Sequence, residues 1–225
     1  MLKEQDSEYN MGTFYSPPII HDGLIHCVDA KNTKSYPGSG TTVTDIAGTS
    51  SGTLTNATFN SNGYFTYDGT TDYIATNLSL PAGNATFSVW ALNNNVNTWR
   101  PFIATTTTDN LFWFGVGANG QLRTHYGNTN YQDTANSIIS VNVWYNVVVT
   151  WDGSAPKFYV NGSLVSSSGN AGANLNSTRT VRIGNYAADG ANWSGHMTQN
   201  NIYNRELSID EVKQNFNAQR GRFGV

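Results

Sequence analysis

The sequence has little charge and no long apolar run. Only 12% of its 225 residues are charged, about half of the roughly 25% usual in soluble domains. With 12 Lys and Arg residues and a net charge of −3, the chain does not carry the basic surface that binds nucleic acid. No apolar stretch approaches the roughly 18 residues of a membrane-spanning helix. We therefore expect neither nucleic acid nor a membrane as a partner.

Cysteine is nearly absent as well. The single cysteine, Cys27, excludes an intrachain disulfide, and its apolar neighbours predict a buried, unreactive thiol. Residues 1–10 are polar and contain no apolar core of a secretion signal. The chain is therefore expected to fold in a reducing cytoplasm.

Small polar residues take the place of the missing charges. The sequence has 29 Asn, 26 Thr, 19 Ser and 22 Gly, together 96 of 225 residues. Strong helix formers are too few for an all-helical protein. Asn-Gly and Asp-Gly pairs tolerate the positive φ of tight hairpin turns. They recur at 62–63, 119–120, 161–162, 22–23, 68–69, 152–153 and 189–190.

Short strand-like runs lie between these turns. Apolar residues alternate at Tyr145, Val147, Val149 and Trp151, as in a strand with one face on a core. About twelve such runs predict an all-β fold, a two-sheet antiparallel jelly-roll sandwich over residues 21–207. The other runs are 24–30, 63–67, 72–77, 85–92, 102–104, 111–116, 122–126, 158–160, 164–165, 179–185 and 195–203.

One short C-terminal helix is predicted within residues 208–225. Ser208 and Glu211 have the spacing of a capping box, and Leu207 and Val212 have that of a hydrophobic staple. Gly221 is a natural stop for the helix. The sandwich therefore ends in a helix and a tail.

Residues 1–20 form an extended N-terminal arm. The arm begins polar and ends in aromatic residues and a Pro-Pro pair, which favours an extended path. We interpret its apolar end as a segment that docks on a larger assembly. The candidate docking residues are Phe14, Tyr15, Pro17, Pro18 and Ile19.

Two segments that would form a hairpin resemble a known family. Residues 146–153 (NVVVTWDG) and 158–162 (FYVNG) are similar to the central hairpin of laminin-G-like domains, which belong to the concanavalin A-like lectin/glucanase superfamily. The resemblance implies a concanavalin A-like sandwich. Further similar segments, in the same order as in the family, are 67–74, 86–90, 182–184 and 202–208.

The two ends of the chain carry a narrower resemblance. Residues 214–224 (QNFNAQRGRFG), together with 23–25 (GLI), resemble stand-alone laminin-G-like proteins of phage particles. This resemblance implies a phage capsid or tail protein as partner and a place on the virion surface, after assembly in the host cytoplasm. It leaves the oligomeric state open.

The superfamily includes glycoside hydrolases, which need two carboxyl groups roughly 5–10 Å apart. No glutamate occurs between Asp72 and Glu206, and the aspartates in that stretch are isolated. The four histidines are scattered, and no Gly-x-Ser-x-Gly elbow occurs. We therefore predict no catalytic residues and no enzymatic activity.

Laminin-G-like domains often hold calcium, so the resemblance raises the question of whether this chain binds calcium. Asp68 and Asp72 flank a Gly-Thr-Thr turn and could donate two of the six to eight oxygens that calcium takes. The alternative is that Asp68 is the turn aspartate of a hairpin. No cofactor is required, and a structural calcium ion is a hypothesis.

Aromatic residues in Asn-rich, loop-like stretches are candidates for contact with a glycan or a protein. The alternative is that they cover the ends of the sandwich. Trp90, Trp113, Trp144 and Trp151 lie in predicted strands and are assigned to the core instead. The candidate contact residues are Trp99, Tyr126, Asn128, Tyr131 and Trp193.

These observations favour a non-catalytic function. The leading interpretation is a phage virion structural or decoration protein, anchored to capsid or tail by its arm, with a laminin-G-like adhesion domain. The alternative is a lectin or receptor-binding protein that attaches to surface glycans of the host. A glycoside hydrolase is the third interpretation, disfavoured because no carboxylate pair is present.

Overall fold

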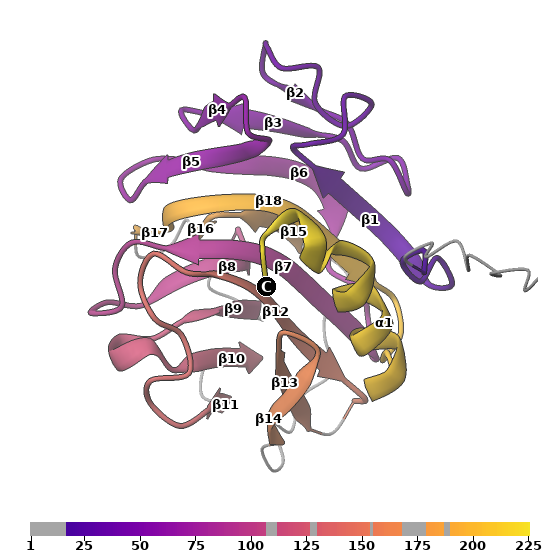
Figure 1. Cartoon of the computed structure of the whole chain (residues 1–225), viewed down its shortest axis with the longest axis vertical. Coiled ribbons are helices and arrows are strands. Elements are labelled where there is room, and N and C mark those ends of the chain that lie inside the picture. The colour runs from indigo at the N-terminus through magenta and orange to yellow at the C-terminus, as the bar shows by residue number, and fades with distance from the viewer. Residues whose placement is uncertain (1–16, 107–111, 127–129, 154, 168–178, 187–189) are drawn as a thin grey trace, which may run out of the picture.

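The computed structural model describes residues 17–106, 112–126, 130–153, 155–167, 179–186 and 190–225. These residues form two eight-stranded antiparallel sheets, called sheet A and sheet B below, and a small two-stranded sheet (Figure 1). The predicted all-β, two-sheet sandwich is therefore confirmed. No helix in the described part of the chain is long and apolar enough to span a membrane.

Sheet A is built around β18, which pairs with three other strands. It runs in the order β14 (Ser163–Ser167), β13 (Pro156–Val160), β12 (Trp144–Trp151), β7 (Ala85–Asn93), β18 (Ser194–Tyr203), β5 (Tyr64–Asp68) and β4 (Thr58–Asn60), with β1 (Leu24–Asp29) also beside β18.

Sheet B packs against sheet A. Its order is β11 (Asn130–Asp133), β10 (Leu122–Tyr126), β9 (Phe112–Val116), β8 (Arg100–Thr105), β15 (Thr180–Ile183), β6 (Tyr73–Ser79), β3 (Gly52–Thr55) and β2 (Thr42–Val43). The small sheet pairs β16 (Asn185–Tyr186) with β17 (Ala191–Asn192), and a 3-10 turn, η1 (Ala118–Gly120), links β9 and β10.

The main core lies between the two sheets. Phe87 of sheet A stacks on Phe112 of sheet B with ring centroids 4.2 Å apart, and Trp151 is fully buried. The predicted hairpin turn at Asn161-Gly162 is present, and both residues have positive φ. Cys27 is buried as predicted, and burial raises the pKa of its thiol to about 12.

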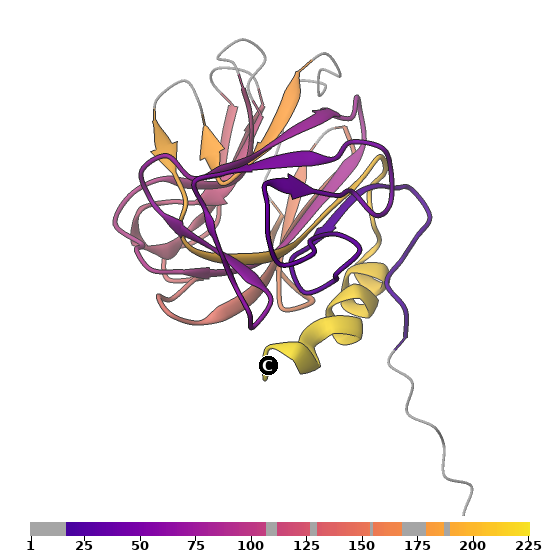
Figure 2. The same ribbon diagram turned by 90° about the horizontal axis from the view of Figure 1, so that it is seen from above.

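The C-terminal helix, α1 (Ile209–Gln219), lies against the outer face of sheet A and continues into the 3-10 turn η2 (Arg220–Arg222) (Figure 2). The capping box of Ser208 and Glu211 is present. Leu207 and Val212 are both buried in one cluster with Tyr203, as the predicted staple requires. The helix therefore covers a second, smaller core outside the sandwich.

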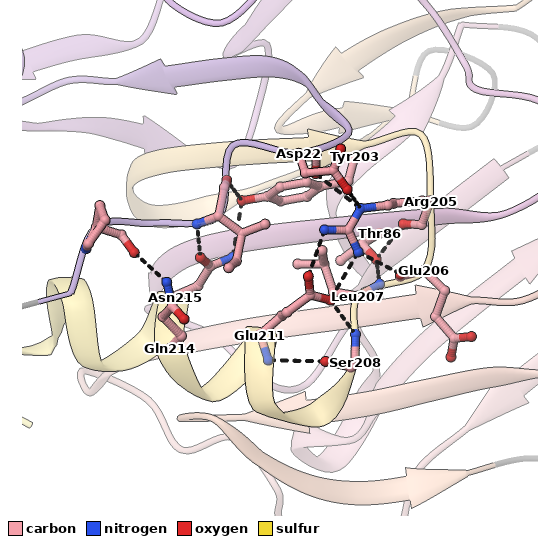
Figure 3. A network of polar contacts seen from close by, with 12 residues as sticks. Asp22, Thr86, Tyr203, Arg205, Glu206, Leu207, Ser208, Glu211, Gln214 and Asn215 are labelled. Atoms are coloured by element: carbon pink, nitrogen blue, oxygen red, sulfur yellow. Dashed lines mark hydrogen bonds and ion pairs between the residues drawn. The ribbon is translucent and has the colours of Figure 1, made fainter.

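The end of the arm is fixed to this helix (Figure 3). The N–H of Ile20 donates to Asn215 Oδ1 at 2.7 Å, and the Ile20 carbonyl accepts from the Tyr203 hydroxyl at 3.0 Å. Gln214 Nε2 donates to the carbonyl of Pro18 at 2.9 Å. Burial raises the pKa of Tyr203 to about 12, so the hydroxyl keeps its proton.

The arm residues themselves are only partly described. Pro17 and Pro18 are exposed, and Ile19 is half-buried. Phe14 and Tyr15 lie outside the described residues. Docking of the arm on another protein, and the division of the chain at residues 20 and 207, stay predictions.

Candidate ligand-binding face

The outward face of sheet B carries a row of rings across three neighbouring strands. Trp113 of β9 lies opposite His125 of β10, which lies opposite Tyr131 of β11. Ring centroids are 6.1 Å apart for Trp113 and His125, and 4.7 Å apart for His125 and Tyr131. Because residues paired in this way point to the same side of a sheet, the register assembles one aromatic surface.

Arg123 lies beside this row and contacts two of the predicted site residues. Its Cζ lies 3.5 Å from the ring centroid of Trp99 and 4.7 Å from that of Tyr131. Its Nε and Nη2 donate to the two carboxylate oxygens of Asp133, both at 2.6 Å. The guanidinium is thus held by a bidentate ion pair and by cation–π contacts with two rings.

Glycines make room for this arrangement. The ring of Trp99 lies over Gly117, where an added Cβ would overlap the ring carbons. A Cβ on Gly115, which pairs with Arg123, would meet the backbone of Arg100 and Pro101. Small residues in and after β9 therefore let the Trp99 ring and the neighbouring strand β8 approach closely.

Some side chains of this face are exposed to solvent, and others are buried beneath them. Tyr131 is 50% exposed, and Trp99 and the Arg123 side chain are partly exposed. Trp113 and His125 are buried beneath them. The exposed rings can pack on the apolar face of a ligand, while Arg123 and Asp133 supply hydrogen-bond donors and acceptors at one edge.

The structure brings together two of the five predicted contact residues, Trp99 and Tyr131. Tyr126 lies in β10, and its side chain is outside the described part of the structure. Asn128 lies outside the described residues. Arg123 and Asp133 were not predicted as site residues. Their sequence signal is the alternation of Arg123 with His125 and of Tyr131 with Asp133, which becomes informative only once the two strands pair.

The prediction of an exposed contact at Trp193 is wrong. Trp193 is fully buried in the main core, with its ring centroid 4.7 Å from that of Phe102. Its backbone N–H donates to the carbonyl of Gly184 at 2.7 Å, which holds this Asn-rich stretch against the sandwich. Trp144, assigned to the core from sequence, is only half-buried.

The carboxylates of Asp68 and Asp72 accept hydrogen bonds within their own turn. Asp72 Oδ2 accepts from the N–H of Asp68 at 2.7 Å, and Asp68 Oδ1 accepts from the N–H and hydroxyl of Thr70 at 2.8 and 2.7 Å. Burial raises the pKa of Asp72, and the nearby charge of Asp68 adds to this rise.

These contacts fit a structural turn better than they fit a calcium site. No group of three or more His, Cys, Asp or Glu side chains suited to a metal ion occurs among the described residues. Three hydrogen bonds to these carboxylates already stabilise the turn, and calcium would need further oxygens from carbonyl groups or waters. We derive no role for calcium.

Comparison with solved structures identifies the architecture. Trypanosoma rangeli sialidase in complex with an inhibitor matches with a TM-score of 0.69 and 18% identity, over 92% of this chain and 36% of that one. The botulinum neurotoxin serotype D binding domain matches with a TM-score of 0.65 and 18% identity, over 89% and 52%. The chain therefore spans about a third to half of these proteins, and at this identity the likeness shows the fold alone.

A third structure matches over nearly its whole length. Domain 4 of an extracellular arabinanase from Geobacillus stearothermophilus, in complex with arabinotriose, has a TM-score of 0.63 and 15% identity, over 84% of this chain and 96% of that one. A search of curated proteins found no matching relative.

The family is shown by a sequence model rather than by these distant structures. A laminin-G-type model, described as concanavalin A-like lectin/glucanases superfamily, matches residues 68–213. This range covers more than half of the chain and runs from the turn at Asp68 into helix α1. The chain therefore belongs to the laminin-G-type family of the concanavalin A-like lectin/glucanases superfamily.

Proposed function

We propose that the chain is a non-catalytic glycan-binding adhesion domain and that its binding surface is the outward face of sheet B. The observation that carries the proposal is the arrangement of Trp99, Arg123 and Tyr131. Sugar rings present apolar C–H faces that pack on aromatic rings, and hydroxyl groups that exchange hydrogen bonds with an Arg–carboxylate pair.

The preorganisation of Arg123 favours binding. Asp133 and the two rings fix the guanidinium before a ligand arrives, so that little side-chain entropy is lost on contact. The arabinotriose complex of the arabinanase domain is consistent with glycan binding by a sandwich of this architecture. That likeness is one of fold, so it adds support only at that level.

The charge pattern favours binding over hydrolysis. Asp133 is paired with Arg123, and Glu206 accepts from Lys157 Nζ at 2.7 Å. A glycosidase needs a carboxyl group that can act as an acid, together with a second carboxyl across the scissile bond. Both oxygens of Asp133 already accept from Arg123, so this carboxylate is engaged in positioning the guanidinium.

A glycan array followed by titration with the bound glycans tests the proposal. We expect Tyr131→Ala and Trp99→Ala each to weaken binding roughly 5- to 30-fold, because each removes ring surface at the centre of the proposed contact. Leu164→Ala removes an exposed apolar side chain from β14 of sheet A and is the matched control. The array should yield no turnover products.

Two results would contradict glycan binding at this face. One is an array without hits for the unmodified protein. The other is unchanged affinity in Tyr131→Ala, whose half-exposed side chain can be removed with little effect on the fold.

A second candidate function is that of a virion structural or decoration protein. It is favoured by the position of the arm, because hydrogen bonds at Pro18 and Ile20 hold the arm beside helix α1, on the outer face of sheet A. The proposed binding surface faces outward from the other sheet. A chain tethered to a capsid or tail protein at its arm would thus present sheet B to the surroundings of the virion.

Deletion of residues 1–19 tests this candidate. The deletion keeps Ile20, whose backbone bonds to Asn215 of α1 and to Tyr203 of β18. The domain should therefore retain its melting temperature while losing incorporation into particles. Normal incorporation of the deleted chain would exclude anchoring by the arm. Electron microscopy of particles would locate the unmodified chain.

A further inference from the structure

A pocket of about 430 Å³ opens on the outer face of sheet A, next to the end of η2. This volume lies within the roughly 300–1,000 Å³ of small-molecule sites and suffices for a monosaccharide unit. The pocket is separate from the proposed binding surface, which lies on sheet B. Its lining includes Tyr64, Trp144, Phe223, Lys31, Arg222 and Asn62.

Three aromatic rings form the walls. The ring centroids of Tyr64 and Trp144 are 5.8 Å apart, and those of Trp144 and Phe223 are 5.1 Å apart. All three side chains are only half-buried although each is large. His196 lies against the Tyr64 ring at 4.5 Å and supports it from β18. The rings thus present apolar surface to the pocket.

Positive charge gathers at one side of the pocket. Arg222 donates to both carboxylate oxygens of Asp29, at 2.7 and 2.9 Å, which fixes its guanidinium at the wall. Lys31 is exposed, and its ammonium donates to the carbonyl of Asn62 at 3.3 Å. The lining contains no carboxylate, so two cations and the single carboxylate behind them leave an excess of one positive charge.

The aromatic rings and the excess positive charge together indicate which kind of ligand fits the pocket. One excess charge matches a single carboxylate, whereas the several charges of a nucleotide or a polyphosphate would call for more cations. The aromatic walls suit the C–H face of a sugar ring. The amide of Asn62 and the hydroxyl of Tyr64 suit its hydroxyl groups.

We propose that this pocket binds an acidic saccharide unit, a sugar ring that bears one carboxylate. The sugar ring packs on the surface formed by Tyr64, Trp144 and Phe223, and the carboxylate lies against Lys31 and Arg222. The site is a second one, on the sheet opposite the surface of Trp99 and Tyr131, and does not depend on that surface. A chain with both sites could engage two parts of one glycan, or two glycans, at once.

Titration calorimetry with a galactose trimer that bears one galacturonic acid unit, and with the neutral galactose trimer, tests the proposal on the full chain. We expect the acidic trimer to bind about five- to tenfold more tightly than the neutral one at low salt, and the difference to shrink as salt rises. Lys31→Gln should reduce the difference to about twofold or less, because it removes the exposed charge and leaves the walls intact. Lys213→Gln, on the exposed side of α1, is the matched control and should change nothing.

Two further variants separate this pocket from the face on sheet B. Trp144→Ala should abolish binding of the acidic trimer, while Tyr131→Ala should leave it unchanged. Equal affinity for the acidic and neutral trimers would overturn the proposal, as would unchanged affinity in Lys31→Gln or the absence of binding at millimolar concentrations of the acidic trimer. Loss of this binding in Tyr131→Ala, with Lys31→Gln unaffected, would assign the ligand to sheet B instead.

Discussion

Replacement of Asp45 by alanine should lower the free energy of unfolding by about 3 kcal/mol. Asp45 is buried, and its Oδ1 accepts from the N–H groups of Cys27, Ala47 and Gly48 at 2.9, 3.0 and 3.1 Å. Oδ2 accepts from the N–H of Ser50 at 3.2 Å. One carboxylate therefore ties strand β1 to the loop that precedes β3, and alanine would leave these donors without a partner.

The stability lost in Asp45→Ala should become smaller as the pH falls. Burial alone would raise the pKa of Asp45, but His26, whose Nδ1 lies 3.2 Å from Oδ2, and the N–H groups of Cys27 and Ala47 outweigh it and hold the pKa far below the usual range. A depressed carboxylate pKa stabilises the fold above the ordinary value near 4, and this stabilisation is lost as the pH falls. The difference between Asp45 and alanine should be largest near neutral pH and shrink below about pH 4.

Urea unfolding of three variants measures this prediction. Asp45→Asn keeps one acceptor oxygen but places an amide NH2 group next to His26 and Ser50. Its free energy of unfolding should lie between those of the unmodified protein and Asp45→Ala. Asp22→Ala removes a carboxylate that is 85% exposed and pairs with Arg205, so it should cost less than about 1 kcal/mol. If Asp45→Ala lost as little stability as Asp22→Ala, the N–H groups of the loop would have to be hydrogen-bonded to other acceptors, and the prediction would be wrong.

Local patterns in the sequence predicted the parts of the fold that depend on neighbouring residues. The capping box at Ser208 and Glu211 and the turn at Asn161-Gly162 are determined within a few residues, and both are present. The alternation over Tyr145–Trp151 correctly indicated a strand, but residues 146–151 are buried on both faces, because helix α1 packs against Val148 on the outer face. Short strands such as β2 and β17 escaped prediction because two residues carry no periodic signal.

The candidate site was predicted less completely, because side-chain burial depends on partners far away in the chain. Trp99 and Trp193 both stand in Asn-rich stretches, yet Trp99 lies over Gly117 at the surface and Trp193 packs on Phe102 in the core. The two tryptophans have similar neighbours in the sequence, and only the pairing of the strands distinguishes the surface residue from the core residue. Arg123 was missed for the same reason, since its role comes from pairing with Asp133 on the next strand.

Replacement of Trp90 by alanine should cost about 3–5 kcal/mol and loosen the C-terminal segment in particular. Trp90 is a buried residue of β7 on the outer face of sheet A. Its Nε1 donates to Gln219 Oε1 at 2.5 Å. Its ring stacks on those of Phe223 and Phe216, with centroids 3.9 and 5.8 Å away. One side chain therefore joins the sandwich to helix α1 and to the tail that follows it.

Trp151→Ala is the matched control, because Trp151 is an equally large side chain buried between the two sheets. Both variants should lose a similar amount of stability, but at different places. In Trp90→Ala, hydrogen exchange of the amides of α1 should accelerate more than that of the strands. In Trp151→Ala, the protection of α1 should fall only in proportion to global stability.

Phe223 connects this prediction to the pocket on sheet A. Without the Trp90 ring, Phe223 loses its closest stacking partner and with it the fixed position of one pocket wall. Trp90→Ala should therefore also weaken binding of an acidic trisaccharide, whereas Trp90→Phe, which keeps a ring but removes the hydrogen bond to Gln219, should retain most of it. Unchanged exchange in α1 after Trp90→Ala would show that the cluster of Leu207 and Val212 and the hydrogen bonds of Asn215 suffice to hold the helix on the sandwich.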